Sequence, residues 1–201
     1  MNKIFTTVLL SFAFLNPLSL IARMPEKMSI HEREFTFSTY YDIESERGSF
    51  GYVTKTSLSV RTYYEYYDAD GTLDASAYLR LLSLGQAYTW AGTLDVYDSQ
   101  GNWAGLIEGA LATFCPARFN FYDADSNLVA IAYMDSNRMG FTVVDANNET
   151  RKIATFNRIF VPELPDHWNV TVQDPDAINP AMLTIFGAFM VDNQSEFKED
   201  T

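Results

Sequence analysis

A segment near the C-terminus is apolar on every side, and this feature limits the folds open to the chain. Ala181–Val191 contains one polar residue, Thr184, within eleven positions. The preceding Asn179-Pro180 is typical of a helix start, since Asn caps a helix and Pro fits its first position. A helix without a polar face must be enclosed by protein or by lipid. Eleven residues rise about 16 Å, roughly half the hydrocarbon core of a bilayer, so this helix is too short to span one.

Much of the remaining chain alternates between apolar and polar residues with the period of a β-strand. Tyr, Phe, Thr and Val fill these segments, and a pleated surface accommodates such residues best. A sheet can enclose an apolar helix by curling around it, so we expect a closed antiparallel β-barrel threaded by a helix from Pro180 to Val191. The alternative is a helix inserted into a membrane interface, although such helices normally keep a polar face. The alternating segments are Phe35–Ser38, Leu58–Tyr63, Leu94–Tyr97, Phe119–Phe121 and Asn169–Gln173.

One turn pattern recurs between the expected strands. A β-forming residue is followed by Asp, two variable residues, and then Gly or a small polar residue. Asp at the start of a turn can accept a hydrogen bond from a backbone N–H two residues on, and Gly or Asn tolerates a positive φ. We therefore interpret each copy as a hairpin tip of a meandering sheet. The copies are Tyr67–Gly71, Tyr97–Gly101, Tyr122–Asn127 and Val144–Asn148, with Tyr41-Asp42 as a looser fifth.

Carboxylates crowd two of these tips, which raises the question of calcium. An EF-hand loop beginning at Asp68 would place Leu73 where the motif needs Gly, and one beginning at Asp123 would place Leu128 there. Neither segment is an EF-hand, and we expect solvated turn carboxylates, with a weak surface Ca²⁺ site as the alternative. The residues concerned are Asp68, Asp70, Asp74, Asp123, Asp125 and Asn127.

The first residues have the pattern of an export signal. Lys3 supplies a positive charge, Ile4–Leu15 is apolar apart from three hydroxyl residues, and Asn16-Pro17 breaks a helix before the small residue Ala22. We predict a mature protein that begins near Arg23 and is periplasmic or secreted, with an uncleaved N-terminal membrane anchor as the alternative. The predicted organisation is a signal peptide over 1–22, an N-terminal tail over 23–34, a barrel domain over 35–193 and a C-terminal tail over 194–201.

The net charge limits the kinds of partner that the protein is expected to bind. The 201 residues carry 14 Lys and Arg against 26 Asp and Glu, a net charge of −12. Nucleic-acid binding and a broad grip on anionic lipid headgroups both need clustered basic residues, so this balance argues against them. A neutral or cationic partner, such as another protein, fits an acidic surface better.

No catalytic motif stands out. The sequence lacks GxSxG, GxxxxGK[ST] and GxGxxG patterns, and His31 and His167 belong to neither HExxH nor a His-x-His pair. The one cysteine, Cys115, has apolar neighbours and is expected to be a buried thiol, with an intermolecular disulfide or a Cys115–His167 dyad as alternatives. We predict no catalytic, cofactor-binding or metal-binding residues, and hence a protein that is not an enzyme.

The order of the later segments resembles a known family. Strands with Asp-x-x-Gly tips are followed by Arg151–Ala154, a strand over Trp168–Val172, an acidic turn over Gln173–Asp176 and the apolar helix. This order is similar to that of the tubby C-terminal-like superfamily, especially its LURP-one-related and phospholipid scramblase-like branches. The resemblance covers roughly Phe35 to Asp192 and implies a barrel of about twelve strands around a central helix.

The resemblance also implies lipid-related functions. Tubby proteins bind phosphoinositides through basic residues on adjacent strand positions, and the scramblase branch carries an acidic calcium segment before its last helix. In this chain Asp174 and Asp176 lie at that place, but the following Ala177–Pro180 adds no carboxylate. The basic residues are scattered and match none of the tubby positions; they are Lys55, Arg61, Arg151, Lys152 and Arg158.

Three functional classes follow. We expect an exported, non-enzymatic binding or structural module of the tubby-like, LURP-one-related type, with a protein partner and no cofactor. The alternative is a phospholipid- or phosphoinositide-binding, scramblase-like protein. A third class is an enzyme whose site is not visible in the sequence, which a cleft with converging titratable groups would favour.

Overall fold

The structure is a computed structural model that describes residues 24–33, 39–56, 61–80, 92–110, 117–160 and 167–194. Within these residues it contains twelve strands followed by one helix. The predicted signal peptide over 1–22, the Phe35–Ser38 strand and Cys115 lie outside the described residues. The elements are β1 (Lys27–Glu32), β2 (Thr39–Ser45), β3 (Gly48–Thr56), β4 (Tyr63–Asp68), β5 (Leu73–Leu79), β6 (Thr93–Asp98), β7 (Trp103–Gly109), β8 (Arg118–Tyr122), β9 (Leu128–Met134), β10 (Gly140–Asp145), β11 (Asn148–Ile159), β12 (His167–Val172) and α1 (Pro180–Asp192).

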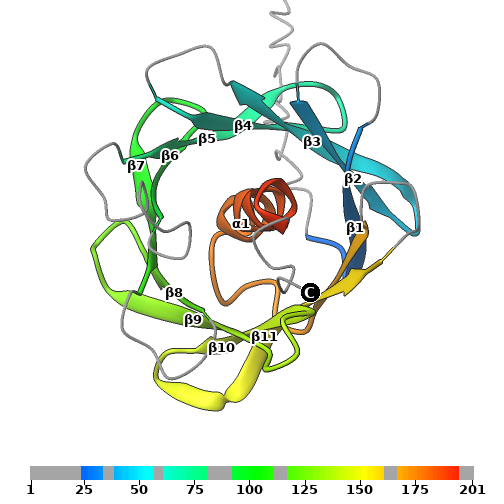
Figure 1. Ribbon diagram of the computed structural model, residues 1–201. Coiled ribbons are helices and arrows are strands. Elements are labelled where there is room, and N and C mark those ends of the chain that lie inside the picture. Colours follow the sequence, from blue (N-terminus) through cyan, green and yellow to red (C-terminus); the bar gives the residue numbers. More distant parts are fainter. Residues whose placement is uncertain are drawn as a thin grey trace, which may run out of the picture.

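The strands form one closed antiparallel barrel. Each strand pairs with its neighbours in the sequence, and β1 closes the ring by pairing with β12. Figure 1 looks along the barrel and shows α1 in its centre. The prediction of a mainly β, closed barrel of about twelve strands around the C-terminal helix is confirmed.

The helix is buried along its whole length. All eleven residues from Ala181 to Val191 are buried, as an apolar helix without a polar face requires. Its start is the predicted one, because Asn179 Oδ1 accepts a hydrogen bond from the backbone N–H of Ala181 at 2.9 Å. The side chain of Phe186 lies at the centre of the core and is fully inaccessible to solvent.

Inward and outward side chains alternate along the strands. On β4, Tyr64 and Tyr66 are buried against the helix side, whereas Tyr63 and Glu65 are partly exposed on the outside. The same two-residue period occurs on most strands of the ring, because successive Cβ atoms of a strand point to opposite faces. On β9, β10 and β11, consecutive residues are buried as well. The barrel therefore has a filled apolar interior and a half-exposed outer face.

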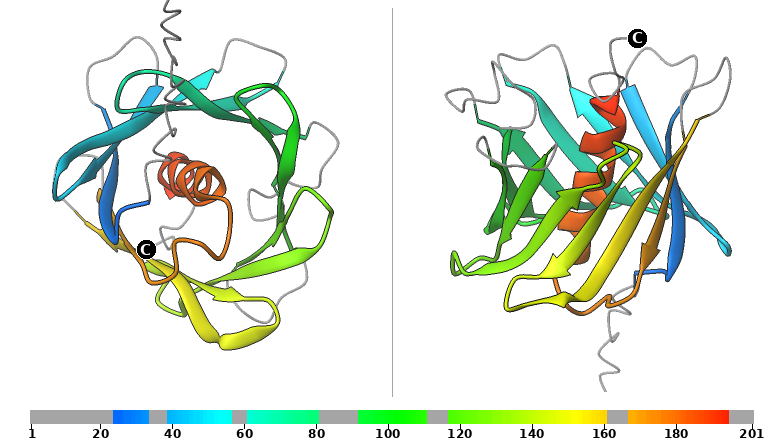
Figure 2. Two further views of the ribbon diagram at one scale, coloured as in Figure 1. Left: turned by 180° about the vertical axis from the view of Figure 1, so that it is seen from behind. Right: turned by 60° about the horizontal axis from the view of Figure 1, so that its bottom comes forward.

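The two ends of the barrel differ. The β2–β3, β4–β5, β6–β7, β8–β9 and β10–β11 hairpins lie at the end where α1 begins. Figure 2 (right) shows these tips at one end and the C-terminal turn of α1 at the other. We call the end at which α1 terminates the mouth of the barrel. Among the described residues, no helix is both long enough and apolar enough to span a bilayer.

Three hairpin tips have the predicted Asp turn. In each, one Oδ of Asp68, Asp98 or Asp123 accepts hydrogen bonds from two backbone N–H groups at 2.8–3.0 Å. The fourth residue of each turn has a positive φ, which is +77° at Gly71 and +65° at Ser126. The prediction that these three segments form hairpin tips is therefore confirmed, including the position that needs Gly or a small polar residue.

Other expectations need correction. Tyr41-Asp42 is not a hairpin tip but lies within β2, because the alternation of Tyr and Asp there belongs to the strand itself. The predicted N-terminal tail over 23–34 contains β1, the strand that closes the barrel. The Val144–Asn148 tip is tighter than the other three, since Asp145 and Asn148 are already paired across the turn.

Candidate functional site

The turn carboxylates are used by the turns themselves. The pKa values of Asp98 and Asp123 are lowered by hydrogen bonds from Asn102 and Asn127 respectively and from the turn backbone. Burial and the nearby Asp68 instead raise the pKa of Asp74. Among the described residues no group of three or more His, Cys, Asp or Glu side chains is arranged to hold a metal ion. These contacts support the interpretation of the tips as structural turns.

At the mouth of the barrel, hydrogen bonds join several titratable side chains to the carboxylate of Asp192. Asp192, the last residue of α1, accepts hydrogen bonds from the hydroxyl groups of Tyr41 and Tyr64, each at 2.6 Å. Lys55 donates to the same carboxylate at 2.7 Å. A carboxylate at a helix C-terminus is disfavoured by the helix dipole, and the Lys55 ammonium offsets this. The cluster joins the end of the helix to β2, β3 and β4.

Electrostatics in this cluster follow from burial. Burial and the Asp192 charge together raise the pKa of both Tyr41 and Tyr64, so both phenols stay protonated and donate. Burial, then the Asp192 charge, raise the pKa of Glu32, while Lys55 opposes this. Because both oxygens of Asp192 already accept hydrogen bonds, the arrangement acts as an anchor for the helix.

The outer face of β2–β6 carries a second kind of cluster. Six tyrosines point outward from these five strands, and their rings contact one another across strands at centroid distances of 5.1–5.9 Å. One of them, Tyr78, is 38% exposed. We call this surface the tyrosine face; it consists of Tyr40, Tyr52, Tyr63, Tyr67, Tyr78 and Tyr97.

Carboxylate side chains lie between these rings, and two of these carboxylates form ion pairs with arginines of the same chain. Arg33 pairs with both oxygens of Asp42, and its guanidinium lies 4.8 Å from the ring centroid of Tyr40. Arg80 pairs with both oxygens of Asp95, at 2.7 and 2.6 Å. A guanidinium between a carboxylate and an aromatic ring combines a bidentate ion pair with a cation–π contact. The face therefore binds guanidinium groups within its own fold.

The third carboxylate of the face lacks such a cation. Glu65 lies on β4 between the outward rings of Tyr63 and Tyr67, and it accepts a hydrogen bond from the Tyr67 hydroxyl at 3.1 Å. Within the described part of the chain no Lys or Arg pairs with it. Glu65 is thus an acidic group between two tyrosines that no described Lys or Arg neutralises.

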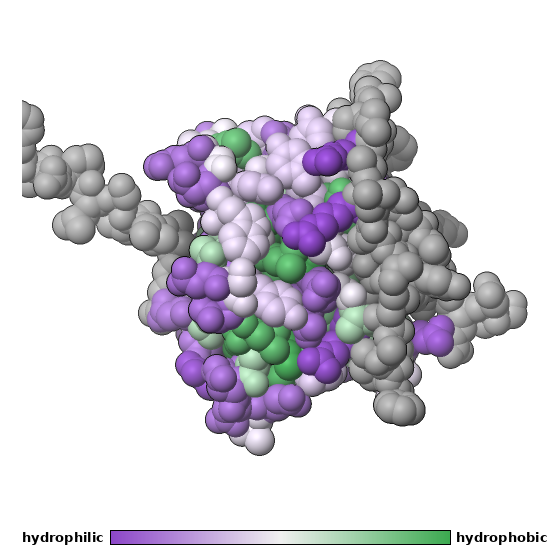
Figure 3. Space-filling view, turned by 90° about the vertical axis from the view of Figure 1, so that its left-hand side faces the viewer, coloured by the Kyte–Doolittle hydropathy of each residue, from purple (hydrophilic) through white to green (hydrophobic). Residues whose placement is uncertain are grey.

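The surface continues onto the next strands. Figure 3 views the side of the barrel that bears β5–β8 and shows ring-shaped side chains of intermediate hydropathy among hydrophilic ones. On β7 and β8, Glu108 and the Tyr122 hydroxyl are 3.5 Å apart. This pair offers a tyrosine and a carboxylate outside the tyrosine face.

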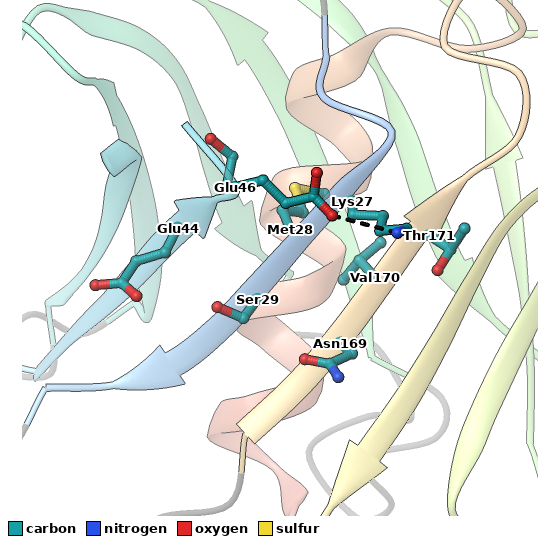
Figure 4. A pocket seen from close by; sticks show the side chains of 9 residues that line it. Lys27, Met28, Ser29, Glu44, Glu46, Asn169, Val170 and Thr171 are labelled. Atoms are coloured by element: carbon teal, nitrogen blue, oxygen red, sulfur yellow. Dashed lines mark hydrogen bonds and ion pairs between the residues drawn. The ribbon is translucent and has the colours of Figure 1, made fainter. Parts of the chain in front are cut away.

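A shallow cleft of about 290 Å³ lies on the outer face over β2, β1 and β12, and it shares β2 with the tyrosine face. Figure 4 shows Glu44, Ser29 and Asn169 on three neighbouring strands, and the exposed ion pair between Lys27 and Glu46, whose charged atoms are 3.2 Å apart. The cleft is open, and the titratable side chains that line it are Lys27, Glu44 and Glu46.

Three of the five basic residues considered for lipid binding contact other groups of the chain. Lys55 binds Asp192 at the mouth, and Arg158 donates to the backbone oxygen of Gln194 at 3.2 Å. Arg151 pairs with Asp145 and Asp174 at the opposite end of the barrel. Asp174, from the acidic segment before the helix, is thus already paired with a cation.

The two histidines, which the sequence separates by most of its length, lie side by side. The ring centroids of His31 and His167 are 4.9 Å apart, with the rings inclined at 29°. Sequence reasoning missed this pair because only the closure of β1 onto β12 brings the two residues together. It also missed the tyrosine face, because only two of the six tyrosines, Tyr63 and Tyr97, lie in segments that were predicted as strands. The proposed Cys115–His167 dyad stays open, since Cys115 is outside the described residues.

No protein-family model matches the chain, and a search of curated proteins finds no match.

Proposed function

We propose that this protein is an exported, non-enzymatic binding module of the tubby-like type, and that its tyrosine face binds a basic segment of a partner protein. The closed barrel around a C-terminal helix is the architecture that the resemblance implies, which supports that part of the proposal. The observation that carries the binding role is Glu65, a carboxylate between two outward tyrosines without a cation from the described chain.

Two arginines of the chain itself show how an arginine of a partner would bind to this face. Arg33 occupies the carboxylate of Asp42 beside Tyr40, and Arg80 occupies Asp95 near Tyr97. An arginine of a partner would meet Glu65 in the same way, with Tyr63 and Tyr67 on either side. Charge complementarity favours this occupant, because the chain carries a net charge of −12 and would attract a basic segment from a distance.

The expected strength follows from the two contacts. An exposed ion pair contributes up to about 1 kcal/mol, and a cation–π contact at an exposed site about 0.5–1 kcal/mol. Removing the Glu65 charge should therefore weaken the binding of an arginine-rich peptide about fivefold. Removing both flanking rings should weaken it about tenfold.

The test is isothermal titration of the protein with a short peptide of alternating arginine and serine. Glu65→Gln and the double variant Tyr63→Ser, Tyr67→Ser probe the face. Glu108→Gln is the matched control, since it removes one charge next to a tyrosine outside the face. We expect the first two variants to lose affinity by the factors above and the control to bind within about twofold of wild type.

Two outcomes would contradict the proposal. An equal loss in Glu65→Gln and Glu108→Gln would show that the peptide responds only to total charge. Sedimentation of the protein with phosphatidylinositol-bisphosphate vesicles at physiological salt, stronger than its binding to the peptide, would instead favour the lipid-binding alternative. We expect negligible sedimentation with or without Ca²⁺.

A further inference from the structure

The two histidines occupy facing positions on the strands that close the barrel. Ile30 on β1 pairs with Trp168 on β12, and both side chains are fully buried in the core. The next residue on β1 and the preceding residue on β12, His31 and His167, therefore face each other on the outer surface. Residues directly opposite on antiparallel strands have Cβ atoms about 4.5–5.5 Å apart, which explains the 4.9 Å between their ring centroids.

This spacing suits a shared metal ion. Imidazole nitrogens bind Zn²⁺ at about 2.0–2.1 Å, so two nitrogens on one ion lie about 3 Å apart. Rings whose centroids are 4.9 Å apart and inclined at 29° can bring one nitrogen each to that separation by rotating about the Cβ–Cγ bond. The two backbones need not move, because the strand pairing already sets their positions.

The immediate surroundings add two observations. The Nδ1 atom of His31 is buried and has no hydrogen-bond partner, an unusual state for a ring nitrogen. Across β1 from His31, on β2, lies Asp42, whose carboxylate is held by Arg33. Both oxygens of Asp42 are thus occupied by the Arg33 guanidinium.

We infer that His31 and His167 form a two-histidine site for a divalent transition-metal ion such as Zn²⁺, Ni²⁺ or Cu²⁺. Among the described residues, no third side-chain ligand of the His, Cys, Asp or Glu type converges there. The imidazole ligands select these ions over Mg²⁺ and Ca²⁺, which prefer oxygen ligands. Among the three, Cu²⁺ binds most tightly.

A metal at this position would act on the fold. It would tie β1 to β12 at the seam where the barrel closes, and these strands come from the two ends of the described chain. An ion that binds the folded state shifts the equilibrium toward it, so a hundredfold excess over Kd raises the ratio of folded to unfolded protein about a hundredfold. The ion is therefore expected to raise the thermal midpoint by several degrees.

The experiment uses the tag-free mature chain with Cys115→Ser, which removes the one thiol that could also bind metal. The chain has two histidines, so imidazole ¹H–¹⁵N spectra contain signals from two side chains. We expect Zn²⁺ to shift both sets of ring signals together and to raise the thermal midpoint. Ca²⁺ at the same concentration serves as the ionic-strength and carboxylate control and should do neither.

His31→Gln and His167→Gln test the shared site. Losing one ligand of a two-point chelate removes the effective-concentration advantage, so each variant should bind about a hundredfold more weakly. Asn169→Gln, on the same outward face of β12, is the control and should retain binding.

Either of two results would overturn the inference. One is the absence of any Zn²⁺-induced change in the histidine ring signals of the folded chain at millimolar metal. The other is a thermal shift that survives removal of either histidine, which would assign the binding to surface carboxylates. The spectra of the histidine-containing parent decide the matter even if a variant folds poorly.

Discussion

Replacing Phe186 tests the packing of the barrel around its helix. The ring is fully buried and makes edge-to-face contacts with four other rings, Phe119, Phe121, Phe141 and Phe156, at centroid distances of 5.2–5.5 Å. Truncation of a buried Phe to Ala typically costs 3–5 kcal/mol, through lost transfer free energy and the cavity left behind. Each aromatic pair contributes about 0.5–1.5 kcal/mol beyond burial. We therefore expect Phe186→Ala to lower the free energy of unfolding by about 4–5 kcal/mol.

Equilibrium denaturation in urea, followed by circular dichroism, measures this loss. Phe160→Ala is the matched control, since that ring is 61% exposed and its removal should change the free energy of unfolding by less than about 0.5 kcal/mol. Phe186→Leu should fall between the two because it refills most of the volume. A loss below about 2 kcal/mol for Phe186→Ala, or one equal to that of Phe160→Ala, would refute the reasoning that the helix fills the barrel.

Three further predictions concern the mouth of the barrel and two glycines. Because the pKa of Glu32 is raised in the fold, its favourable contribution to stability is present below the ordinary value of 4.5 and is lost as the pH rises through the raised one. Urea denaturation of Glu32→Gln should thus show a gain of less than about 1 kcal/mol at pH 7 that vanishes at pH 4. Asp192→Asn, which leaves an ammonium and two phenols around a neutral amide, should cost about 2–3 kcal/mol by denaturation, whereas Glu46→Gln in the exposed pair should change nothing measurable. Gly105→Ala should cost more than about 3 kcal/mol in thermal unfolding, because its φ is +150° and a Cβ would lie 2.3 Å from a carbonyl oxygen of β8; Gly101→Ala, with φ +82° and open space around it, should cost about 1 kcal/mol.

The fold was largely predictable because two local patterns agree with each other. The apolar helix Ala181–Val191 must be surrounded by other parts of the protein, and a sheet formed by the alternating strands can surround it. The Asp turns add the connections, since their hydrogen bonds are made within a few residues. The strand β1 could not be predicted, because Lys27–Glu32 is short and follows no turn signal. Its role becomes visible only through its pairing with β2 and β12.

The candidate sites were less predictable for the same reason. The tyrosine face exists because Tyr52 pairs with Tyr67 and Tyr63 with Tyr78, and strand register sets both pairings. The anchor at Asp192 needs a helix end to meet three strands that precede it by more than a hundred residues. Side chains brought together by barrel closure leave no spacing in the sequence for a motif search to find.

Mapping the surface that a basic peptide contacts tests the proposed binding role most directly. In ¹H–¹⁵N spectra of the folded protein titrated with the arginine–serine peptide, the account predicts that the largest shifts fall on β2–β6, centred on Tyr63, Glu65 and Tyr67. Backbone signals of β8–β10 should stay within the digital resolution. Shifts spread evenly over all acidic residues, or centred on the cleft over β1 and β12, would contradict it.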